Sequence, residues 1–147
     1  MQTLRMICLS VIITFSFCMA ASAGEIHQAV ESNNLPKVKA IIAADPSAIN
    51  EKDSDGWTPL AYAARFGRKE IAQFLIQKKA AVNIADNNGY TPLHQAAAYD
   101  QRQLIELLLN NGADVNARTS GGVTPRRLAV SNGHKRAVDL LGSRGGK

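Results

Sequence analysis

The sequence predicts an all-α protein, an α-solenoid of about four stacked helical repeats. Three observations predict it: a motif that recurs at 33-residue steps, prolines placed where helices would begin, and apolar residues spaced to line one face of a helix. Units of this kind have an apolar face that each can bury only against a neighbour. The chain's 147 residues are enough for one such domain.

The first 23 residues are predicted to be a cleaved secretory signal peptide. Arg5 precedes an apolar run that ends at Ala20, and the small residues Ala21-Ser22-Ala23 follow it. The run has about 14 residues, whereas a membrane-spanning helix needs about 20. We therefore expect a processed chain, residues 24–147, without a membrane-spanning segment. A retained anchor and lipidation at Cys18 are the less favoured alternatives.

Both cysteines, Cys8 and Cys18, lie in this leader, so the processed chain would contain no thiol. A chain without cysteine suits an oxidising compartment, because no wrong disulfide can form there. We therefore predict a periplasmic location, with secretion as the alternative.

Positive charge gathers at the C-terminal end. The formal net charge is +5 for the whole chain and +4 without Arg5. From Arg118 onward, seven basic residues accompany one acidic residue, Asp139. A solvated end face explains this excess best, and attachment to an acidic surface is the alternative. No nucleic-acid partner is expected.

A turn-and-helix motif recurs three times in the middle of the chain. Thr-Pro dipeptides stand at 58–59, 91–92 and 124–125, and in each copy one residue separates the threonine from a preceding glycine. The threonine can cap a helix that begins at the proline, since proline fits the first helical turn and lacks the N–H that would be unpaired there. The glycines permit the positive φ of a tight turn. Apolar-Asn pairs recur in the same phase at 49–50, 82–83 and 115–116.

A second helix is predicted in each unit from apolar residues at positions i, i+3 and i+4. These residues are Ile71, Phe74 and Leu75, and then Leu104, Leu107 and Leu108. In the first helix, small pairs at 63–64 and 96–97 would allow neighbouring helices to approach closely.

These motifs resemble the ankyrin repeat. The third unit is the most similar, with Thr91-Pro92-Leu93-His94, Ala96-Ala97 and the segment Asn111 to Ala117. The resemblance extends from Glu25 to about Leu141. It implies a β-turn and two antiparallel helices per unit, and a role in binding other proteins.

The units are placed at approximately 24–53, 54–86, 87–119 and 120–147. The first lacks the Thr-Pro turn, and the last has Arg126-Arg127 in place of Leu-His, so both are predicted to be capping repeats. Lys79 replaces the glycine that stands at Gly112, and Asp100 replaces the one between helices. Both residues are expected to adopt a left-handed backbone conformation, which is strained for a residue with a side chain. Lys79→Gly should therefore stabilise the fold.

No catalytic residues, cofactor or metal site are predicted. The three histidines, His27, His94 and His134, lack metal-ligand spacing, and the latter two occupy structural positions of the ankyrin pattern. Haem binding through an isolated histidine stays open. Neither a nucleophile elbow nor a P-loop is present. We therefore expect a binding protein and not an enzyme.

The binding face is predicted from two columns of aromatic residues. Trp57 and Tyr90 follow the turn glycines, while Phe66 and Tyr99 lie after the small pairs of the first helices. The ankyrin resemblance implies that these positions face solvent, and exposed rings favour a protein interface. The predicted rim consists of Asp55, Arg65, Asn87, Asn88 and Arg118. The alternative is that the four rings pack on one another.

The partner is predicted to be another protein of unspecified identity, bound by a monomeric chain. Support or protection of another enzyme is the favoured role. The alternatives are an immunity protein that neutralises a toxin, a secreted effector, and attachment to an acidic surface through the basic C-terminal repeat.

Overall fold

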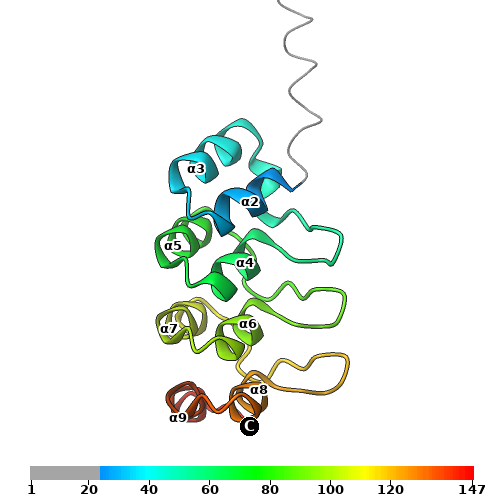
Figure 1. Cartoon of the computed structure of the whole chain (residues 1–147), viewed down its shortest axis with the longest axis vertical. Helices are drawn as coiled ribbons and strands as arrows, with labels where there is room; N and C mark the ends of the chain where they lie inside the picture. The colour runs from blue at the N-terminus through cyan, green and yellow to red at the C-terminus, as the bar shows by residue number, and fades with distance from the viewer. Residues whose placement is uncertain (1–23) are drawn as a thin grey trace, which may run out of the picture.

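The computed structural model describes residues 24–147, so the predicted leader lies outside the described residues. Eight α-helices form four antiparallel pairs stacked along one axis, and the described residues contain no strand (Figure 1). This confirms the predicted α-solenoid. In chain order the pairs are α2 (Glu25–Glu31) and α3 (Leu35–Ala44), α4 (Pro59–Phe66) and α5 (Lys69–Gln77), α6 (Pro92–Ala98) and α7 (Arg102–Asn110), and α8 (Pro125–Ser131) and α9 (Lys135–Ser143).

The first helices of the pairs form one row, and the second helices form another (Figure 1). Within the first row, α4 packs on α2 and α6, and α6 packs on α8. Three long loops project beyond the first row, each leading from one pair to the next (Figure 1). A short 3-10 helix, η1 (Pro46–Asn50), follows α3.

Helices α4, α6 and α8 begin at the proline of each Thr-Pro motif, as predicted. The hydroxyls of Thr58 and Thr124 each accept the backbone N–H three residues later, at 3.3 Å. Thr91 makes a different contact, since its hydroxyl lies 2.9 Å from Nδ1 of His94. His94 Nε2 lies 2.9 Å from the carbonyl of Val123. The ring must donate through Nε2, so Nδ1 accepts from the Thr91 hydroxyl.

The projecting loops are tight turns joined into a row. Each turn glycine has positive φ, for example 85° at Gly56 and 84° at Gly89. The backbone N–H of Asn87 donates to the carbonyl of Asp55 at 3.0 Å, and that of Ser120 donates to the carbonyl of Asn88 at 2.9 Å. Each turn is therefore held by the next one along the stack.

The core runs continuously between the helix rows. The small pairs of α4 and α6 are fully buried, so the first helices approach closely as predicted. In the second helices of the central repeats, the predicted i and i+4 residues are buried. Phe74 and Leu107, at the i+3 positions, pack at the edge of the core. The largest buried apolar side chains of the two central repeats are Leu60, Ile71, Leu75, Leu93, Leu104, Ile105 and Leu108.

Side-chain hydrogen bonds join successive repeats in three series. Asparagines of the apolar-Asn pairs bond to the backbone of the following repeat. Residues between the paired helices donate to a carbonyl of the preceding repeat: Arg68 to Glu31, Gln101 to Arg65, and His134 to Ala98. His27 and His94 each reach the turn of the next repeat, whereas the second repeat has Ala61 at that register and lacks this bond.

Both predicted departures from glycine have left-handed backbone. Lys79 has φ 70° and Asp100 has φ 52°, compared with 88° at Gly112 and 67° at Gly67. A third residue of this kind, Asn33, has φ 57° in the first repeat. These positions require a conformation that glycine adopts with least strain.

Candidate functional site

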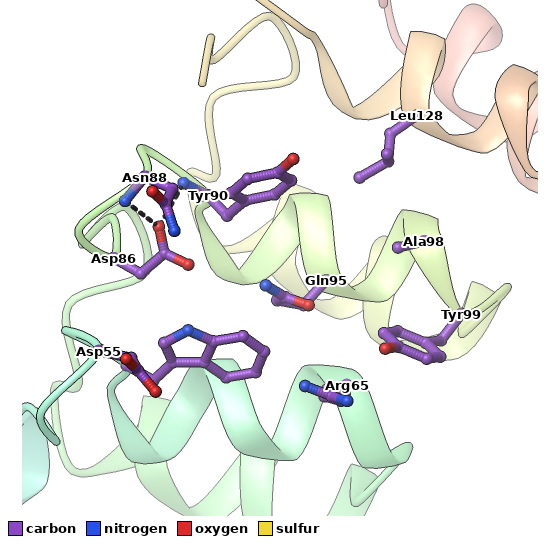
Figure 2. Close-up of a pocket in the computed structure, with 10 residues that line it drawn as sticks. Asp55, Arg65, Asp86, Asn88, Tyr90, Gln95, Ala98, Tyr99 and Leu128 are labelled. Carbon is purple, nitrogen blue, oxygen red and sulfur yellow. Dashed lines mark hydrogen bonds between the residues drawn. The ribbon is translucent and has the colours of Figure 1, made fainter. Parts of the chain in front are cut away.

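Two neighbouring hollows lie on the concave face between the projecting turns and the first helices of the described chain. The larger has a volume of about 410 Å³ and opens between α4 and α6 (Figure 2). Its walls come from three successive repeats: Asp55, Trp57 and Arg65, then Asp86, Asn88, Tyr90, Gln95, Ala98 and Tyr99, and finally Leu128. The smaller, of about 260 Å³, is lined by Glu31, Asp53, Asp55, Trp57, Tyr62, Arg65 and Phe66. The two hollows share three lining residues.

Trp57 is positioned by the turn that precedes α4. Asp53 Oδ1 accepts the backbone N–H of Asp55 at 3.0 Å and that of Trp57 at 2.8 Å. Its Oδ2 accepts the hydroxyl of Tyr62 at 2.9 Å, and the Tyr62 ring meets the indole edge to face at 5.5 Å. The Asp53 carboxylate therefore closes the turn and, through Tyr62, holds the indole against a fixed neighbour.

The same contacts shift two pKa values. Burial acts to raise the pKa of Asp53, but the hydrogen bonds from Trp57, Tyr62 and Asp55 outweigh it, and the pKa falls below its ordinary value. Burial, with the hydrogen bond to the Asp53 carboxylate, raises the pKa of Tyr62 to about 12. Around neutral pH the pair is therefore a carboxylate that accepts from a neutral phenol.

Tyr90 is held in the equivalent way one repeat later. Asp86 Oδ1 accepts the backbone N–H groups of Asn88 at 2.8 Å and Tyr90 at 2.9 Å. The Tyr90 ring packs edge to face on His94, with centroids 5.7 Å apart. Burial lowers the pKa of His94, against the hydrogen bond to Val123, so the imidazole is neutral at pH 7.

Arg65 lies among three of the aromatic rings. Its guanidinium carbon is 5.1 Å from the ring centroids of Trp57 and Tyr99 and 5.5 Å from that of Phe66. These are cation–π distances. In residues 24–147 the guanidinium makes no ion pair within 4.0 Å and no hydrogen bond. Arg65 therefore bridges rings of the second and third repeats.

The structure brings together most of the residues predicted for the binding face. Six of the nine line the larger hollow, and Phe66 lines the smaller. Asn87 and Arg118 line neither hollow. Asn87 Nδ2 donates to the carbonyl of Ser54 at 3.1 Å, which joins two turns, and Arg118 Nη1 lies 3.5 Å from the carbonyl of Gly122 within its own turn.

The four predicted rings do not form a packed cluster of their own. Within the described chain, none of the close ring pairs joins two of Trp57, Phe66, Tyr90 and Tyr99. Tyr62 instead contacts both Trp57 and Phe66. Tyr99 is 46% exposed, and the other three rings are half-buried. The rings thus offer surface to the hollows while resting on their neighbours.

Several lining residues were missed by the sequence reasoning. Asp86 stands 33 residues after Asp53, so the repeat register was a signal for it. Tyr62 packs on the core and also lines the smaller hollow. No sequence signal marked Gln95 or Leu128, because their role depends on how adjacent first helices face one another.

The histidines all make structural hydrogen bonds. His27 is 3% exposed, and its Nε2 lies 2.9 Å from the carbonyl of Trp57. It occupies the register of His94, a match hidden in the sequence by the one-residue insertion after α3. From Gly24 onward, no three His, Cys, Asp or Glu side chains gather as a metal site would require.

The hollows present ring faces, carboxylates and one guanidinium, which are groups suited to recognition.

A search of residues 24–147 finds no helix with the length and apolarity needed to cross a bilayer.

Comparison with known proteins identifies repeats along the described chain. A family model described as ankyrin repeats (3 copies) matches residues 26–119, and one described as ankyrin repeats (many copies) matches residues 101–141. The human NAD-capped RNA hydrolase NUDT12 is 41% identical over 54 residues, which cover 37% of this chain and 12% of the hydrolase. The probable 26S proteasome regulatory subunit p28 of Saccharomyces cerevisiae is 38% identical over 53 residues, covering 36% and 23%. The chain thus spans less than a quarter of either relative.

Proposed function

Because the chain belongs to the ankyrin-repeat family, a fold of protein–protein interaction and not of catalysis, we propose that it binds a partner protein through its concave face. The observation that carries this proposal is the larger hollow, where Trp57, Tyr90 and Tyr99 line one depression across adjacent repeats. Rings held by their own turns lose little freedom on binding, and aromatic residues supply much of the energy at interfaces.

The proposal places this interaction in the periplasm, with the chain supporting or protecting another enzyme. The leader composition and the absence of cysteine after residue 23 support this location. We expect the exported protein to begin at Gly24, because Ala21-Ser22-Ala23 is suited to signal cleavage. N-terminal sequencing of the exported protein tests this, and a start elsewhere would contradict the leader assignment.

The test of the binding face uses the purified chain to capture its partner from a periplasmic extract of its own source. Once the partner is identified, affinities are measured for Trp57→Ala and Tyr90→Ala. Each variant should weaken binding by about 2 kcal/mol or more, since each removes a ring from the centre of the site. Val130→Ala is the matched control, because Val130 is 56% exposed on α8 and lines neither hollow.

Melting temperatures separate binding from folding in this test. Unchanged affinity in both ring variants would refute the concave site. Melting many degrees below the original chain would instead show that the rings act mainly in packing. Attachment through the basic last repeat makes a different prediction, because binding through exposed charges weakens strongly at high salt and is indifferent to the two rings.

A further inference from the structure

The charged side chains that line the two hollows are predominantly acidic. Glu31, Asp53, Asp55 and Asp86 contribute four carboxylates, and Arg65 contributes the one basic side chain. The chain as a whole has the opposite sign, with a formal net charge of +5. A basic group approaching this face therefore meets an excess of carboxylates, whereas basic residues are in excess over the rest of the molecule.

Several of these carboxylate oxygens are available to a ligand. Asp53 uses both oxygens within its turn, whereas Asp86 uses Oδ1 for backbone N–H groups. Among residues 24–147, no hydrogen bond or ion pair engages Asp86 Oδ2 or the side-chain carboxylates of Asp55 and Glu31. Arg65 lines the same hollows but forms no ion pair with these carboxylates, since its guanidinium lies over the aromatic rings.

The aromatic rings of the larger hollow can hold a cation against them, as the position of the Arg65 guanidinium shows. Its guanidinium lies 5.1 Å from the centroids of both Trp57 and Tyr99, and no carboxylate of the described chain comes within 4.0 Å of it. Asp55 and Asp86 lie at one end of the larger hollow, and Arg65 and Tyr99 lie at the other (Figure 2). At the acidic end, the Tyr90 ring makes no cation–π contact with any described residue.

From this juxtaposition of Asp55, Asp86 and the Tyr90 ring in one hollow, we propose that the site receives an arginine or lysine side chain from a basic segment of the partner. The inference rests on the proposed function. The incoming cation lies between the two carboxylates, and its stem packs on the rings. Arg65 keeps the far end of the hollow positive, which favours a segment with its basic residue near the turns.

The probe is a phage library of random dodecapeptides, selected on the purified chain. Peptides enriched in arginine and lysine are expected. Their affinities are then measured by isothermal titration calorimetry, which reports binding equally well in every variant, Trp57→Ala included. The double variant Asp55→Asn/Asp86→Asn should bind about tenfold more weakly. Its turn is retained, because the asparagine at 86 still offers Oδ1 to the two N–H groups.

The matched control is Glu106→Gln/Asp139→Asn. It makes the same change in net charge at two exposed positions that line neither hollow, and it should leave affinity unchanged. Acidic or uncharged peptides among those selected, or basic peptides indifferent to the double variant, would overturn the inference.

Trp57→Ala separates this failure from failure of the proposed function. If peptides of another composition bind and lose affinity in Trp57→Ala, the concave site stands and the basic ligand is wrong. If no selected peptide depends on Trp57, both proposals fail.

Discussion

Replacing Lys79 with glycine should stabilise the protein. Lys79 follows α5 with φ 70°, a conformation that costs a residue with a Cβ about 1 to 2 kcal/mol. Its N–H donates to the carbonyl of Ile76 at 2.9 Å, and the N–H of Ala80 donates to that of Leu75 at 2.9 Å. This is the Schellman pattern, in which glycine is preferred at the left-handed position. A glycine at 79 keeps both hydrogen bonds and removes the strain.

The size of the gain follows from two opposing effects. The Lys79 side chain is exposed, and within residues 24–147 it makes no hydrogen bond or ion pair, so its loss removes little. Glycine also gives the unfolded chain more freedom, which costs about 0.4 to 1 kcal/mol. The net stabilisation is then about 0.5 to 1 kcal/mol. For a domain of this size it should raise the melting temperature by about 2 to 4 °C.

The assay is thermal unfolding followed by circular dichroism, with the reverse change as its control. Gly112 holds the equivalent position after α7, and a Cβ there would meet nothing within 4 Å. Gly112→Lys should therefore lose stability through backbone strain alone. Asp100→Gly should gain less than Lys79→Gly, because aspartate tolerates the left-handed region better than lysine. A melting temperature of Lys79→Gly equal to or below the original would refute the strain argument.

Two further predictions concern the turns and pH. Gly89→Ala should lower the free energy of unfolding by about 2 kcal/mol or more, because its Cβ would lie 2.8 Å from the backbone nitrogen of Ser120. Gly112→Ala, which meets no such neighbour, should lower it by about 1 kcal/mol. Equal losses of stability in denaturant unfolding would contradict the clash. Burial lowers the pKa of His94, so as pH falls below the ordinary histidine value of 6.5 the unfolded chain takes up a proton before the folded one does. The stabilising contribution of neutral His94 should therefore be fully present above that pH and should decline below it. The melting temperature is measured between pH 8 and 5 for the original chain and for His94→Gln. If both show the same pH dependence, the decline is due to other groups.

The fold could be predicted from the sequence because the repeat makes local and global signals agree. Each Thr-Pro marks a helix start in the correct phase, and the helices begin at those prolines. The left-handed residues Lys79 and Asp100 were found by register against glycines of other repeats. Repetition thus supplies several independent observations of one structural unit.

The candidate site was only partly predictable, because a hollow depends on side-chain directions across repeats. The ankyrin resemblance implied that the aromatic columns face solvent, and the rings are exposed or half-buried, but nothing in the sequence indicated that Arg65 lies over three of them. Asn87 was expected at the rim, and the structure uses its amide to join neighbouring turns instead. The repeat register could have indicated Asp86 and His27. Asp86 lies 33 residues after Asp53, whereas the one-residue insertion after α3 hides the match between His27 and His94.

The histidine missing from the second repeat removes one hydrogen bond between the second and third repeats. His27 and His94 tie their repeats to the following turns, but Ala61 leaves the junction of the second and third repeats without this bond. The larger hollow straddles that same junction, with Trp57 on one side and Tyr90 on the other. Other contacts still hold this junction, since the N–H of Asn87 donates to the carbonyl of Asp55 at 3.0 Å. A ligand that contacts both walls of the hollow would therefore add a link at the junction that, within residues 24–147, has no histidine hydrogen bond.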